Sequence, residues 1–236
     1  MQVASTEIGK ILKRLADFAI ATQTQRFFKT GKGEYSEGDQ FLGIRVPVLR
    51  EQAKKFEDAP LKEVQKLLES PFHEERLCAL LILVRKFAKG TPAEKTRIYT
   101  LYLNSTQSIN NWDLVDSSAY HIVGPYLEHQ DRRPLHELSK SDSLWERRIA
   151  IISTFHFIRN YQYDDAISIS KQLLNDPEDL IHKAVGWMLR EIGNRDMVTE
   201  ETFLKDHYQQ MPRTMLRYAI EKFPEPNRRK YLQGLI

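Results

Sequence analysis

Two pairs of residues in this sequence place an aromatic ring and a charged group one helical turn apart. Trp112 and Asp116 are separated by four positions, and so are Lys183 and Trp187. Residues four apart share one face of a helix. The two pairs together predict a site that combines aromatic walls with a carboxylate.

Each of these residues also has a purely structural explanation. Asp113 lies near the expected start of a helix, where an acidic side chain complements the helix dipole. Asp116 is expected deeper in a helix of apolar and small residues, so its carboxylate needs either an ion-pair partner or a function. Trp187 would also suit a helical core. The residues by themselves leave both explanations open.

A third segment carries consecutive arginines after Trp145. Neighbouring positions on a helix point about 100° apart, so Arg147 and Arg148 cannot perform the same task. We expect one of them to reach an inner groove and the other to pair with a neighbouring helix. The alternative is a solvated charged pair beside Glu146.

Several other chemistries are disfavoured by the sequence. It contains no glycine-rich phosphate-binding motif and no HExxH motif, and its seven histidines lack the spacing of metal ligands. A single cysteine excludes an internal disulfide framework and a four-cysteine zinc site. Cys78 lies in an apolar run and is expected to be buried and inert.

The elements that must position these residues are predicted to be helices throughout. Apolar residues recur at helical spacing along nearly the whole chain, whereas alternation with a period of two is hard to find. Gly and Pro, ten of each, are too few for a turn-rich sandwich or barrel. No long linker divides residues 1–236, so we predict one all-α domain. No apolar run approaches the roughly 20 residues that span a bilayer, and the chain fits a reducing cytosol.

The helices show signs of a repeat. A basic residue precedes a small one by three positions in three segments, and the small residues Ala79, Ala150 and Gly186 are 71 and 36 positions apart. A period near 36 fits this spacing if one further unit occupies residues 111–127. Helix pairs of this length stack into a curved α-solenoid, with HEAT-like units as the nearest type. The alternative is a coincidental similarity between amphipathic helices.

Proline and glycine mark the expected boundaries. Pro at the first helical position is a common helix start, and four dipeptides precede a helical pattern in this way. Residues 30–40 contain three glycines and form the clearest predicted loop. The four dipeptides are Ser70-Pro71, Thr91-Pro92, Asp176-Pro177 and Met211-Pro212.

The chain resembles the AlkD-type family of HEAT-like-repeat DNA glycosylases, which act in DNA alkylation repair. The resemblance runs from about Arg26 to about Phe223 and depends on the order and spacing of several motifs. These are Phe41-Leu42-Gly43-Ile44 with Pro47 and Arg50, Trp112-Asp113 with Val115-Asp116-Ser117, Trp145 with Arg148, and Lys183-Ala184-Val185-Gly186-Trp187 with Leu189-Arg190-Glu191.

The resemblance implies a monomer that holds duplex DNA in a basic concave groove and removes cationic N3- or N7-alkylated purines. The reaction would need no metal, no cofactor and no deep base-flipping pocket, and would take place in the cytoplasm, on the nucleoid. Asp116 matches the family's catalytic carboxylate, and Arg148 its active-site arginine. Trp112 and Trp187 match the aromatic pair beside the lesion.

Two departures from the family pattern stand out. Phe27 or Phe28 falls where the family often carries a tyrosine near the DNA, and residues 31–39 look like an added loop. Two other functions also stay open: a relative that binds branched or distorted DNA without cleaving it, and a protein–protein scaffold.

Charge placement is the physical test of DNA binding. The chain has 35 basic and 32 acidic residues, a net charge of +3, and such a sum can hide a basic face backed by an acidic one. Basic residues that contact phosphates should gather on one side; the alternative is that they form ordinary solvated faces. The residues expected on the concave side are Arg45, Arg50, Arg148, Lys183, Arg190, Arg213 and Arg217.

Overall fold

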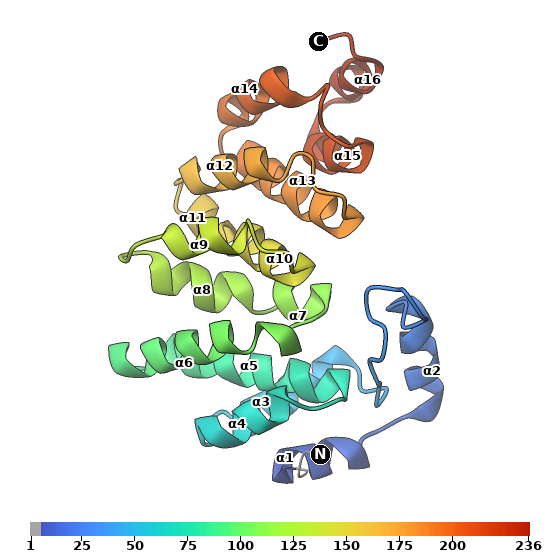
Figure 1. Cartoon of the computed structure of the whole chain (residues 1–236), viewed down its shortest axis with the longest axis vertical. Helices are drawn as coiled ribbons and strands as arrows, with labels where there is room; N and C mark the ends of the chain where they lie inside the picture. Colours follow the sequence, from blue (N-terminus) through green and yellow to red (C-terminus); the bar gives the residue numbers. More distant parts are fainter. Residues whose placement is uncertain (1–5) are drawn as a thin grey trace. The chain divides into compact units, whose positions relative to one another are not determined.

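The computed structural model describes residues 6–236, and the secondary-structure elements of that range are helices (Figure 1). An isolated bridge between Gln40 and Phe72 is the one β-type pairing found there. The predicted all-α fold is therefore confirmed. No helix of the described part is both long and apolar enough to cross a bilayer. The chain divides into two compact units with a boundary between Ile122 and Val123; the single domain over 1–236 stays a prediction.

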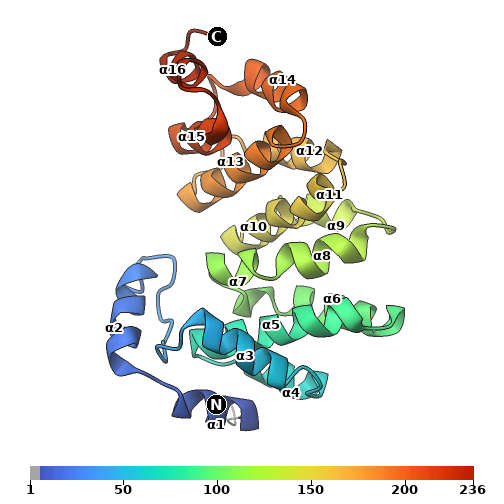
Figure 2. The same cartoon turned by 180° about the vertical axis from the view of Figure 1, so that it is seen from behind.

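Helix α5 (His73–Lys89) forms the centre of unit 1. Every residue from His73 to Leu83 is buried, as expected for a helix covered on all sides. It packs against α3 (Val46–Lys55), α4 (Leu61–Leu68) and α6 (Pro92–Asn104), which lie beside it in Figure 2. The other elements are α1 (Glu7–Arg14), α2 (Phe18–Phe27), a 3₁₀ turn (Thr106–Ser108), α7 (Trp112–Asp116) and the first residues of α8 (Ala119–Leu127).

Helix α13 (Asp179–Gly193) has the same central place in unit 2. It contacts α10 (Leu144–Ser153), α14 (Met197–His207) and α15 (Arg213–Ala219), and both views show it between α10 and α15 (Figures 1 and 2). The other elements are α9 (Arg133–Leu138), α11 (Phe155–Arg159), α12 (Asp164–Gln172), a 3₁₀ turn (Ile220–Lys222) and α16 (Glu225–Gln233).

Gly186 permits the close approach of α13 and α15. A Cβ atom at this position would lie 2.4 Å from the Met215 carbonyl oxygen and 2.5 Å from the Tyr218 Cβ. Gly186→Ala should therefore destabilise the protein by about 2 kcal/mol, because overpacking costs about 1–3 kcal/mol and exceeds the gain of about 1 kcal/mol in helix propensity. Urea unfolding measures this loss.

Gly31→Ala is the matched control for that substitution. Its Cβ would meet only the flexible side chain of Glu34, so the free energy of unfolding should change little. Equal stability of the Gly186→Ala variant and the wild type would show that the two helices separate at no cost.

The predicted proline boundaries are correct in some places and displaced in others. Helix α6 begins at Pro92 behind a capping box formed by Thr91 and Glu94. Pro212 is instead the N-cap of α15. Pro71 and Pro177 each lie two positions before their helices, α5 and α13. The reason is local, because the side chains of Ser70 and Asp176 accept hydrogen bonds from the amides of Phe72 and Glu178. Each of these hydrogen bonds forms a turn ahead of the helix.

Equivalent positions of the expected repeat make equivalent contacts in two of three cases. The guanidinium of Arg76 donates to the carbonyl of Ser70 at 3.0 Å, and that of Arg147 donates to the carbonyl of Ser141 at 3.0 Å. Both carbonyls lie six positions upstream. Lys183 differs, because it pairs with Asp179 on its own helix at 2.7 Å. These contacts support a repeat, whose HEAT-like type stays a prediction.

The expected repeat unit over residues 111–127 is broken into two helices. Helix α7 ends at Asp116, and α8 begins at Ala119. The Ser118 hydroxyl donates to the Leu114 carbonyl at 2.6 Å, a side-chain bond that competes with regular helix. The sequence led us to expect Asp116 deep in a long helix. It lies instead at the end of a short one.

Candidate functional site

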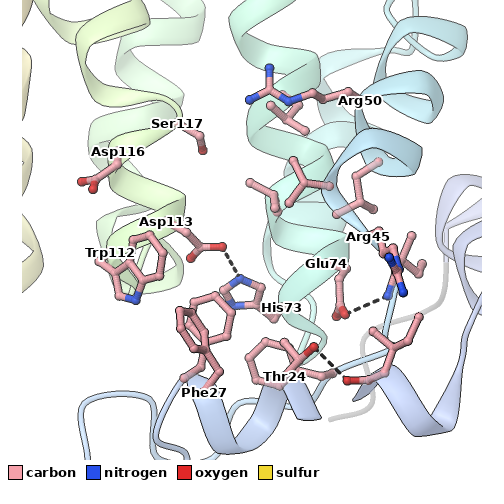
Figure 3. Close-up of a pocket in the computed structure, with 18 of the residues that line it drawn as sticks. Thr24, Phe27, Arg45, Arg50, His73, Glu74, Trp112, Asp113, Asp116 and Ser117 are labelled. Atoms are coloured by element: carbon pink, nitrogen blue, oxygen red, sulfur yellow. Dashed lines mark hydrogen bonds and ion pairs between the residues drawn. The ribbon is translucent and has the colours of Figure 1, made fainter. Parts of the chain in front are cut away.

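The candidate residues of unit 1 surround a cavity of about 710 Å³. Its walls come from α2, the segment that follows it, α3, α5 and the region of α7 (Figure 3). The site residues predicted in this unit are all among those that line it. They are Phe27, Arg45, Arg50, Trp112 and Asp116.

Trp112 forms an aromatic wall with two phenylalanines from α2 and the residue after it. Its ring stacks on Phe28 at 5.4 Å between centroids and meets Phe27 edge-on at 6.1 Å. Phe28 is buried and also stacks on Phe41 at 5.3 Å. Phe27 is 66% exposed. Of the two phenylalanines that the sequence left open, Phe27 therefore has the ring that a ligand can reach.

The two carboxylates of α7 point in different directions (Figure 3). Asp113 Oδ2 lies 2.8 Å from His73 Nε2, so the residue expected only to complement the helix dipole also forms an ion pair. Asp116 is half-buried and lines the cavity. Trp112 and Asp116, the pair chosen for its spacing, thus lie on the walls of the same cavity.

His73 is the important residue that the sequence did not single out. Its ring is 2% exposed, with Nε2 facing Asp113 and Nδ1 lying 3.3 Å from Asp39 Oδ2. Burial lowers the pKa of this imidazole, but the neighbouring carboxylates outweigh burial and raise it to about 9. The only signal in the sequence was the polar run that begins an otherwise apolar helix, His73 to Arg76.

Asp39 connects the predicted loop to the same group of residues. Its Oδ1 accepts a hydrogen bond from Arg76 at 2.7 Å, and the carboxylate is buried. Burial raises the pKa of Asp39, but the hydrogen bonds and charges of His73 and Arg76 hold it below its usual value. The carboxylate is therefore ionised at neutral pH.

The Phe41–Ile44 motif owes its shape to one buried carboxylate. Glu74 accepts hydrogen bonds from the amides of Leu42 (2.8 Å), Gly43 (2.7 Å) and Ile44 (3.2 Å). Gly43 has φ of 80°, and a Cβ there would lie 2.0 Å from the Asp17 carbonyl oxygen. Only glycine fits this position. The turn that it allows follows directly on Phe41, which lines the cavity.

In unit 2 the structure distinguishes the consecutive arginines. Arg147 is the residue that pairs with a neighbouring segment, with Nε 2.6 Å from Asp176 Oδ2. Arg148 is 4% exposed and donates to the Leu180 carbonyl. It is thus more enclosed than a groove-facing arginine was expected to be.

The remaining candidates of unit 2 lie on α13 and α15. Trp187 is half-buried, with Nε1 3.3 Å from Glu191 Oε1. Arg190 pairs with Glu221, whereas Arg213 and Arg217 are exposed. That these residues share one face with the arginines of unit 1 stays a prediction.

Cys78 is buried, and burial raises the pKa of its thiol to about 12. The predicted burial of Cys78 is confirmed, and its inertness stays a prediction. Between residues 6 and 236 the structure has no group of three His, Cys, Asp or Glu side chains arranged to hold a metal ion.

One comparison with known proteins identifies a family for this chain. A family model described as DNA alkylation repair enzyme matches residues 8–223. A solved structure, a predicted DNA alkylation repair enzyme from Enterococcus faecalis, is similar with a TM-score of 0.68 and 16% identity. The likeness covers 89% of this chain and 97% of that one, and at this identity it shows the fold alone. No curated protein matches the sequence.

Proposed function

The chain belongs to the DNA alkylation repair enzyme family, and from this premise we propose that it is a monofunctional DNA glycosylase. Its substrates are cationic N3- and N7-alkylated purines in duplex DNA, and it hydrolyses their N-glycosidic bond as a cytoplasmic monomer without metal or cofactor. The observation that carries the proposal is the shared cavity of Trp112, Asp116, Arg45 and Arg50.

The chemistry needs few residues. An alkylated purine already carries a positive charge and leaves as a neutral base, so it needs no general acid. Ordinary sugar hydrolysis, in contrast, needs a second carboxyl to protonate the leaving group. What the reaction requires is an oriented water and stabilisation of the positive charge that develops on the deoxyribose. One ionised aspartate can supply both by hydrogen bonding and electrostatics.

Asp116 is the carboxylate that we assign to this role. Both carboxylates of α7 line the cavity beside the aromatic wall, and Asp113 Oδ2 is bonded to His73 Nε2 at 2.8 Å, so we assign the catalytic role to Asp116, the one that matches the family's catalytic carboxylate. Trp112 can place its ring face against the cationic lesion nucleotide, a contact worth about 0.5–2 kcal/mol. The exposed Arg45 and Arg50 are suited to phosphates.

Two residues of unit 2 complete the proposed set by their correspondence to the family motif. By that correspondence Trp187 contacts the lesion nucleotide together with Trp112. Arg148, 4% exposed and bonded to the Leu180 carbonyl in this structure, has to turn toward the DNA for its guanidinium to bind a phosphate next to the lesion. Lys183, Arg190, Arg213 and Arg217 extend the phosphate contacts along the DNA. The damaged nucleotide stays stacked rather than entering a deep pocket.

Base release from methylated duplex DNA tests the function. The wild-type protein should liberate 3-methyladenine and 7-methylguanine and leave abasic sites, which break only on later treatment with alkali. Unmethylated duplex is the control. DNA binding that weakens with salt, without any freed base, would identify a binding protein instead. Absence of DNA affinity would favour a protein–protein scaffold.

A further inference from the structure

The loop that the family resemblance marks as an addition has two buried polar side chains. Most of residues 31–38 are exposed, but Ser36 is 1% exposed and Asp39 is 6% exposed. Polar groups are buried in proteins when they are hydrogen-bonded. Ser36 is bonded to Asn111 at the start of α7, and Asp39 is bonded to His73 and Arg76 of α5. Helix α5 in turn packs against α7.

Ser36 fixes the residue that caps α7. The Asn111 side chain donates from Nδ2 to Ser36 Oγ at 2.5 Å, and its Oδ1 accepts the Trp112 amide at 2.8 Å. Asn111 is fully buried. The loop therefore holds the cap of the helix that carries Trp112 and Asp116.

Asp39 acts on the same helix through His73. The two ring nitrogens face two carboxylates, Asp39 at 3.3 Å and Asp113 at 2.8 Å. A neutral imidazole has one donor nitrogen and one acceptor, so both contacts are favourable only when both nitrogens carry protons. Arg76 is the other charged group of this cluster, bonded to Asp39 and to Asn110. Two negative and two positive charges then balance.

The same imidazole supports the aromatic wall. Phe41 stacks on the His73 ring at 4.7 Å between centroids, and Phe28 lies 4.9 Å from it. Phe28 in turn stacks on Trp112. His73 thus contacts the first turn of α7 through Asp113 and reaches the Trp112 ring through Phe28.

We propose that His73, held by Asp39 of the loop, is a positioning residue that orients α7, and with it Trp112 and Asp116, for base release. The inference rests on the proposed function and goes beyond it, because it assigns a role to the loop. Misplacement of a reacting group by about 1 Å can slow an enzyme about 100-fold. A scaffold of this kind therefore acts on the rate more than on DNA affinity.

His73→Gln is the direct test, since glutamine offers a donor at only one of its two terminal atoms. We expect the single-turnover rate of base release to fall about 10- to 100-fold, with the Kd for duplex DNA unchanged within about threefold. Asp39→Asn should slow the reaction in the same direction. Glu37→Gln, an exposed carboxylate of the same loop, is the matched control and should keep the wild-type rate.

Hydrogen exchange provides a readout that does not depend on activity. The amides of Val115 and Ser117 bond to Asn111 and Asp113 within α7, and their exchange, corrected for intrinsic rates, should be faster in His73→Gln. In the wild type the same loosening should appear only as pH rises through about 9, where His73 loses its proton. The variant should lack this step.

The two measurements separate the possible failures. Unchanged exchange in α7 of the His73→Gln variant overturns the inference, and so does faster exchange with an unchanged rate of base release. A wild-type protein that releases no base refutes the proposed function instead. The exchange measurement then decides alone whether His73 orients α7.

Discussion

Replacement of Asp116 by asparagine should lower the single-turnover rate of base release by about 100-fold or more. Asparagine keeps the shape of the side chain but removes the negative charge that, in the proposed mechanism, faces the developing cation on the sugar. Loss of a single preorganised electrostatic contact in an active site costs about 100- to 1,000-fold. Release of 7-methylguanine from methylated duplex, with enzyme in excess, measures the effect.

Two controls make the Asp116 result specific. Asp58→Asn removes an exposed carboxylate of the same unit and should leave the rate unchanged. The unfolding midpoint of Asp116→Asn should stay close to that of the wild type, which excludes loss of folding as the cause. An unchanged rate in Asp116→Asn would make this carboxylate structural, as the sequence alone had allowed.

The second large effect concerns Glu200 in unit 2 and the stability of the protein. Burial raises the pKa of this carboxyl to about 8, with a further increase from the charge of Glu201 and a decrease from Arg190. Its side chain lies against Gly193, where a Cβ would fall within bonding distance of the carboxylate. The folded protein therefore holds a proton that the unfolded chain releases near pH 4.5, the ordinary pKa of a glutamate.

The sign of the pH dependence follows from this difference. The folded state binds more protons than the unfolded state between pH 4.5 and 8, so stability falls as pH rises through that window. At 1.36 kcal/mol for each pKa unit, the loss between pH 5.5 and pH 8 is about 3 kcal/mol. Glu200→Gln carries no titrating group and should remove this part of the pH dependence.

Urea unfolding of the wild type and Glu200→Gln at about pH 5.5 and about pH 8 tests this prediction. Deprotonation of His73 also lowers the stability of the folded protein as pH rises from 6.5 toward 9. This loss is the same in both proteins and cancels in the comparison. Asp206→Asn, an exposed carboxylate of the same helix, is the control. A Glu200→Gln variant with the wild-type pH dependence would mean that Glu200 is ionised in the folded protein.

Local patterns determined a large part of this molecule. Helical periodicity predicted the all-α fold, because apolar residues at helical spacing must cover a core whatever their neighbours are. The spacing of four between Trp112 and Asp116 predicted that they share one helix face, since this depends only on helix geometry, and both residues line one cavity. The burial of Cys78 followed from its apolar surroundings in the chain.

Only the tertiary structure decided which charges meet. Asp39 and Asp113 lie 34 and 40 positions from His73, and no periodicity connects a loop, a helix start and a second helix. The same applies to the consecutive arginines, where the position of Asp176 selects Arg147 as the paired residue. Helix formation is decided within a few neighbouring residues, whereas ion pairs and cavity walls depend on how distant segments pack.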